Sequence, residues 1–100
     1  MRIIYNTTFI VEEAIEEEWI AHIREHYLGS LGKLGLCDDA IFTKVSIDQP
    51  EGKTYSIQLV FHDEVQKEHF LSQYLPEIEA GIARRYANRY VCFNSILTEI

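Results

Sequence analysis

The sequence predicts one α+β domain over residues 1–100, with strands and helices in the order β-α-β-β-α-β. Three observations predict this order. Residues 53–61 alternate between apolar and mostly polar side chains, as in a strand that helices cover on one face. Residues 12–28 and 63–86 instead space their apolar side chains at helical intervals. Residues 49–52, QPEG, combine proline and glycine in a turn that suits a hairpin between two strands.

The first half of the chain predicts a strand, a helix and a loop. β-branched and aromatic residues dominate residues 2–11, which indicates the first strand. Over residues 12–28, glutamates crowd the first turns, where the helix dipole favours negative charge. One side of this helix carries the apolar residues Ile15, Trp19, Ile20, Ile23 and Tyr27. Three glycines then predict the end of the helix and a loop over residues 29–39, with or without a short helical turn inside it.

The second half predicts a hairpin, a helix and a final strand. Alternating patterns indicate strands at residues 40–48, 53–61 and 89–98. Asp63 is a good N-cap for the second helix, with Gln66 at the capping-box position. The helical stripe continues to about Tyr86 and contains Pro76. Because proline removes a backbone donor, we expect a kink or a break there.

Right-handed crossovers around a central hairpin make this order a ferredoxin-like sandwich. Its four-stranded antiparallel sheet would have the strand order 4-1-3-2, with two helices on one face. The open face is predicted to carry Ile4, Thr8, Ile10, Val60, Tyr90 and Ile96, with the polar residues Asn6, Ser56, Gln58 and Asn94. Such an apolar patch predicts a homodimer through the open sheet face. The alternative is a hydrated face with scattered apolar residues.

Charge and composition argue against several classes of partner. Sixteen acidic residues against nine lysines and arginines give a net charge of −7, which disfavours nucleic acid and anionic membrane surfaces. No apolar run approaches the roughly 18 residues of a membrane span, and the N-terminal residues lack the features of a signal peptide. Cys37 and Cys92 form no metal-binding or redox motif, so we expect free thiols in a reducing cytoplasm.

Histidines and aromatic residues on the first helix are the main candidates for a site. We expect a pocket between this helix and the sheet, with the ligand-binding residues Trp19, His22, His26 and Tyr55, with or without Tyr5. Asn6 and Gln58 are further ligand-binding candidates, on the open face of the sheet. His26 and Tyr55 are also the catalytic candidates, since a histidine near a helix C-terminus suits a general acid or base. His22 and His26 have a metal-ligand spacing, but no third ligand is placed near them. No metal and no cofactor is therefore predicted.

Asn6, Gln58 and Asn94 are expected to lie together on the open face. They would either satisfy one another's hydrogen bonds or line a small polar cavity.

Several short motifs resemble a family of bacterial proteins of about one hundred residues that is known only as a domain of unknown function. The motifs are IIYN at 3–6, EEEW at 16–19 with His26, TYSIQ at 54–58, Pro76, YVCF at 90–93 and LTEI at 97–100. This family is similar in fold to ferredoxin-like dimeric α/β barrels. The resemblance implies relatives among cofactor-independent monooxygenases, isomerases and stress-response proteins, with pockets between sheet and helices.

Three functional hypotheses remain open. The first is a small cytoplasmic homodimer that binds a small molecule or a protein partner without catalysis. The second is a cofactor-independent oxygenase or isomerase of the dimeric α/β barrel type, with His26 as acid or base. The third is a structural module whose sheet face pairs with another protein.

Overall fold

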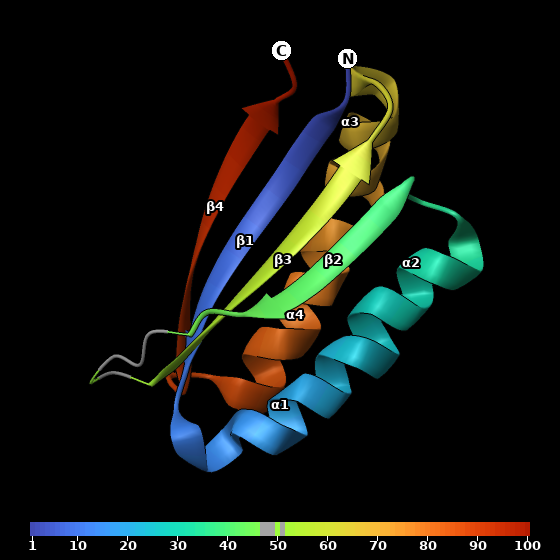
Figure 1. Ribbon diagram of the computed structural model, residues 1–100. Helices are drawn as coiled ribbons and strands as arrows, with labels where there is room; N and C mark the ends of the chain where they lie inside the picture. The colour runs from blue at the N-terminus through green and yellow to red at the C-terminus, as the bar shows by residue number, and fades with distance from the viewer. Residues whose placement is uncertain (47–49, 51) are drawn as a thin grey trace.

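The computed structural model describes residues 1–46, 50 and 52–100. Its sheet consists of β1 (Ile3–Val11), β2 (Asp39–Lys44), β3 (Lys53–Phe61) and β4 (Tyr90–Thr98). The strands lie in the order β2-β3-β1-β4 and every neighbouring pair is antiparallel. This is the predicted order 4-1-3-2 read from the other edge, and the helices lie on one face of the sheet (Figure 1). Residues 49 and 51 of the predicted turn lie outside the described residues.

The first helical stretch is longer than predicted. It begins with η1 (Glu13–Ile15) and α1 (Glu16–His22), widens into the π-helix η2 (Ile23–Leu28) and ends with α2 (Gly29–Leu34). The expectation of a loop directly after residue 28 was therefore wrong. The helix ends at Gly35, whose φ of 61° is the left-handed conformation that glycine adopts readily. The amide of Leu36 donates to the carbonyl oxygen of Leu31 at 3.3 Å and closes this end.

The second helical stretch consists of two helices, which corrects the prediction of two helices in the whole domain. α3 (Glu64–Gln73) and α4 (Leu75–Tyr86) are separated by Tyr74, whose φ of −122° is not helical. Pro76 lies in the first turn of α4, where its missing N–H leaves no helical bond unmade. Of the two alternatives expected near Pro76, a kink or a break, the structure therefore shows a break. The predicted N-cap is confirmed, since the Asp63 carboxylate accepts from the Gln66 amide at 2.8 Å.

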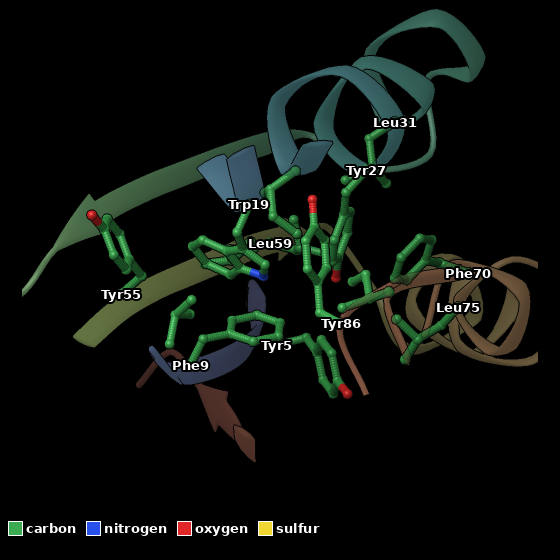
Figure 2. Packing of buried hydrophobic residues seen from close by; sticks show 14 of the residues in the cluster. Tyr5, Phe9, Trp19, Tyr27, Leu31, Tyr55, Leu59, Phe70, Leu75 and Tyr86 are labelled. Atoms are coloured by element: carbon green, nitrogen blue, oxygen red, sulfur yellow. The ribbon is translucent and has the colours of Figure 1, made fainter. Parts of the chain in front are cut away.

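A core of aromatic and aliphatic side chains fills the space between the helices and the sheet (Figure 2). Trp19 is fully buried against Phe9 and Tyr55, with ring centroids 5.1 Å apart in both pairs. Phe70 of α3 packs on Phe61 of β3. Burial of these large side chains attaches both helical stretches to the central strands β1 and β3.

The strand register corrects the residues assigned to the open face. Tyr90, Asn94 and Ile96 pair with Val11, Thr7 and Tyr5, so they share the helix side of the sheet with those buried residues. The open face of β4 instead carries Val91, Phe93, Ser95 and Leu97. Ile96 is 51% exposed although it lies on the helix side, because the helices leave this part of the edge strand uncovered. No helix among the described residues has both the length and the apolar character required to cross a bilayer.

Candidate functional site

A surface groove of about 700 Å³ lies between η2–α2 and α4. Its floor and walls are apolar, with contributions from Tyr27, Leu34, Leu36, Tyr74, Ile78 and Ile82. The polar lining consists of His22, His26, Ser30, Glu77, Arg84 and Arg85, and Gly81 completes the wall on α4. An apolar pocket of this size with a few polar groups is the usual form of a small-molecule site.

The π-helix η2 shapes the first wall of the groove. The Gly29 amide donates to the carbonyl oxygen of Arg24, five residues back, which is the wider π pattern. The Ser30 hydroxyl donates to the His26 carbonyl oxygen at 2.9 Å and satisfies an acceptor in this irregular turn. Single π turns inside α-helices occur frequently at functional sites.

His22 and His26 lie together on this wall, as their spacing predicts. Their ring centroids are 4.8 Å apart, and the His22 ring meets the Tyr86 ring edge-on at 5.7 Å. His22 is half-buried and its Nδ1 has no hydrogen-bond partner among the described residues. Burial, followed by the neighbouring charges of His26 and Arg85, lowers the pKa of His22. The ring is therefore neutral at neutral pH.

His26 is much more open to solvent, with 61% of its side chain exposed. Its nearest carboxylate is that of Glu25, at 3.9 Å from Nε2. His26 thus reaches the groove from its rim.

Two arginines form the polar part of the opposite wall. The Arg85 guanidinium donates to the Glu18 carboxylate at 3.2 Å and to the Tyr86 hydroxyl at 3.1 Å, so its position is fixed from two sides. Arg84 makes no ion pair within residues 1–46 and 52–100. Its Nη2 lies 3.9 Å from the point where a Cβ on Gly81 would stand. Sequence reasoning missed both arginines, although two adjacent cations at the end of an amphipathic helix are a visible signal.

The other predicted ligand-binding residues lie away from the groove. Trp19 is in the core, and Tyr55 lies on its far side from Tyr27 (Figure 2). The Tyr55 hydroxyl donates to Glu16, and Lys44 donates to the same carboxylate at 3.0 Å. Burial and the Glu16 carboxylate together raise the pKa of Tyr55.

Asn6 and Gln58 are opposite each other in the register of β1 and β3, on the open face of the sheet. Asn6 Oδ1 accepts from the Ser56 hydroxyl at 2.9 Å, and its amide nitrogen lies 3.4 Å from Ser95 Oγ. Asn94 does not join them, because it faces the helix side and accepts from Thr7 at 2.9 Å. The three-amide cluster expected from the sequence is therefore replaced by a cluster of Asn6 with small hydroxyl residues.

A second, much smaller cavity of about 40 Å³ lies between α4 and the strands β1 and β4. Thr7, Tyr27, Glu79 and Cys92 contribute to its lining. Tyr27 thus separates this cavity from the groove, and its hydroxyl has no hydrogen-bond partner among the described residues. Within those residues, no three His, Cys, Asp or Glu side chains are placed to hold a metal ion.

The fold is found in proteins of varied activity. An ethyl tert-butyl ether d (ethd) family protein from Bacillus halodurans matches with a TM-score of 0.67 and 11% identity, over 98% of this chain and 99% of that one. Hydroxynitrile lyase from Passiflora edulis matches with a TM-score of 0.64 and 17% identity, over 98% and 95%. A dimeric ferredoxin-like protein from an uncultured marine organism matches with a TM-score of 0.66 and 10% identity, over 99% and 97%.

At such identities these structures establish the ferredoxin-like fold alone. No sequence among the curated proteins matches this chain. The family model that matches covers residues 2–100, and it confirms the resemblance seen in the short motifs. The chain belongs to the family described as domain of unknown function DUF4286.

Proposed function

We propose that this protein is a cytoplasmic homodimer that binds a small molecule in the groove between η2–α2 and α4, without catalysing a reaction. The observation that carries this proposal is the groove itself, whose volume of about 700 Å³ suits a small organic ligand. Its apolar floor offers burial to the body of such a ligand, and its polar residues offer orientation. Cys37 and Cys92 are free thiols, which agrees with a reducing compartment.

The arrangement of the acid–base candidates favours binding over catalysis. A general acid or base works through a hydrogen bond to a reacting group in a site that holds the substrate. His26 lies at the exposed rim, and the only charged neighbour recorded for it among the described residues is Glu25, at 3.9 Å. Tyr55 is separated from the groove by Trp19, and its hydroxyl already donates a hydrogen bond to Glu16. Because of these positions, His26 and Tyr55 cannot both contact one substrate in the groove.

The dimer is proposed to form through the open face of the sheet. Val91, Phe93 and Leu97 of β4 expose about half or more of their surface there, and Ile41 of β2 exposes 42%. A second copy turned by a two-fold axis would bury both apolar faces at once. The dimeric description of a solved structure with the same fold supports self-association. The polar cluster around Asn6 lies within the same face and would fix the register of the two sheets.

Native mass spectrometry of Phe93→Glu tests the dimer. The new charge stands on the exposed apolar side of β4 in the proposed interface, so we expect a monomer where the unmodified protein is a dimer at micromolar concentration. Val65→Glu is the matched control, because Val65 is 78% exposed on α3, in the helix layer. An unmodified protein that is monomeric, or a Phe93→Glu protein that stays dimeric, contradicts the proposed interface.

The Gly81→Leu variant tests the groove. A Cβ at position 81 would meet no atom closer than Arg84 Nη2 at 3.9 Å, and Gly81 lines the groove, so we expect a leucine side chain to extend into it. Gly32→Leu is the control, since Gly32 is also helical, has open space at its Cβ and does not line the groove. After incubation with a small-molecule extract of cells, we expect extra mass on the unmodified protein and on Gly32→Leu, and none on Gly81→Leu. Equal uptake by all three proteins, or uptake by none, contradicts binding in the groove.

A further inference from the structure

We propose that the groove selects a ligand with a single carboxylate on an apolar, aromatic-sized body, and that Arg84 binds the carboxylate. This inference rests on the proposed function of the groove and adds the chemical class of its ligand. The chain as a whole carries a net charge of −7. The groove differs from the rest of the chain in its charge, because its lining contains two arginines, Arg84 and Arg85, and one acid, Glu77.

Arg84 is the arginine that is available to a ligand. Arg85 already donates to the Glu18 carboxylate and the Tyr86 hydroxyl, so its charge is paired within the protein. Arg84 has no such partner within residues 1–46 and 52–100, and its guanidinium lies over the bare backbone of Gly81 in the groove wall. A guanidinium presents a planar pair of donors that matches a carboxylate in a bidentate geometry.

The remaining lining limits the charge and defines the body of the ligand. Glu77 is two helical turns before Arg84 on the same helix and would repel a second negative charge. A monoanion is therefore favoured over a phosphate dianion. Tyr27, Ile78 and Ile82 provide an apolar surface below the charged residues, which an aromatic or branched aliphatic body would cover.

His22 lines the first wall of the groove beside His26. Its Nδ1 is buried and has no hydrogen-bond partner among the described residues. The groups that act on the His22 ring are Glu18, Glu25, His26 and Arg85. Arg85 is paired with Glu18, and neither Glu18 nor Glu25 belongs to the groove lining.

Isothermal titration calorimetry with three probes of nearly equal shape tests the selection by charge. The probes are 2-naphthoate, 2-naphthamide and 2-naphthylmethylammonium. We expect 2-naphthoate to bind the unmodified dimer most tightly, by about fivefold over the amide, which is the upper range for a partly exposed ion pair. Arg84→Gln should remove this advantage and leave the affinity for the amide unchanged. Arg24→Gln is the matched control, because Arg24 is an exposed arginine on η2 that does not line the groove.

The outcomes separate this inference from the proposal on which it rests. If the amide binds as tightly as the carboxylate, selection by charge is overturned while binding in the groove stands. If 2-naphthoate keeps its advantage in Arg84→Gln, the role of Arg84 is overturned. If none of the probes binds the unmodified protein, both this inference and the use of the groove as a small-molecule site are overturned.

Discussion

The Tyr27→Phe substitution should stabilise the protein, because it removes a buried hydroxyl that lacks a partner. Tyr27 is 2% exposed, and its ring stacks on Phe70 with centroids 6.5 Å apart. Its hydroxyl makes no hydrogen bond within the described residues, and burial raises the pKa of the phenol well above its ordinary value. In the unfolded chain the same hydroxyl is hydrated, so folding loses that hydration without a compensating bond.

The size of the effect follows from two opposing terms. Leaving a buried hydroxyl unsatisfied costs about 1–3 kcal/mol, and phenylalanine removes this cost. The substitution also removes one oxygen atom from a packed site, which loses a small dispersion contribution while the ring keeps its contacts with Phe70. We expect a net gain of about 1 kcal/mol in the free energy of unfolding, or about 4–8 °C in Tm for a domain of this size.

Urea unfolding followed by the fluorescence of Trp19 measures this gain, at one fixed protein concentration because the proposed dimer couples stability to concentration. Tyr55→Phe is the contrasting control. Its hydroxyl donates to Glu16, so this variant should lose about 1 kcal/mol instead. A loss of stability in Tyr27→Phe would refute the reasoning, because it would mean that the Tyr27 hydroxyl has a bonding partner in solution.

Two further predictions concern the groove. Gly81→Ala should raise the free energy of unfolding by about 0.5–1 kcal/mol, because alanine restricts the unfolded chain and its Cβ meets only Arg84 Nη2 at 3.9 Å; an unchanged or lower Tm contradicts this. Burial lowers the pKa of His22 in the folded protein. When the pH drops below the unfolded pKa of about 6.5, the unfolded chain binds more protons than the folded one, so the free energy of unfolding decreases as the pH decreases. His22→Gln should therefore lose less stability than the unmodified protein between about pH 7 and 5, and parallel curves from urea unfolding would count against it.

Most of the fold could be predicted from sequence because the strands carry a strong alternating pattern. β3 has the predicted bounds, and β1 and β4 begin one residue later than expected. The helix end was harder to predict, since Gly29 and Gly32 resemble a loop but continue the helix to Leu34. Leu31 explains the difference: it is buried in the core, and its packing outweighs the low helix propensity of the neighbouring glycines.

The sequence divides the residues of β4 into two faces, but it does not indicate which face lies on the helix side of the sheet. Both sets contain apolar residues, because the helices cover little of this edge strand and Tyr90 alone packs partly on the core. The site was predictable only in part for a similar reason. The spacing of His22 and His26 places them on one helical wall, but the facing wall depends on how α4 is turned after the break at Tyr74. That rotation is a tertiary property, so Arg84 and Arg85 could not be assigned to the site from their position in the sequence.

Local features that oppose stability gather around the groove, and this concentration is an argument for function. Four buried polar side-chain atoms among the described residues lack a partner, and two of them, His22 Nδ1 and the Tyr27 hydroxyl, belong to groove residues. Gly81, a poor helix former, lies within α4 at the same place, and η2 interrupts the regular α-helix on the opposite wall. A chain selected for stability alone would fill or satisfy such positions, as it does around Phe61 and Phe70. Gly81→Leu should therefore lose the ligand although it leaves the fold intact.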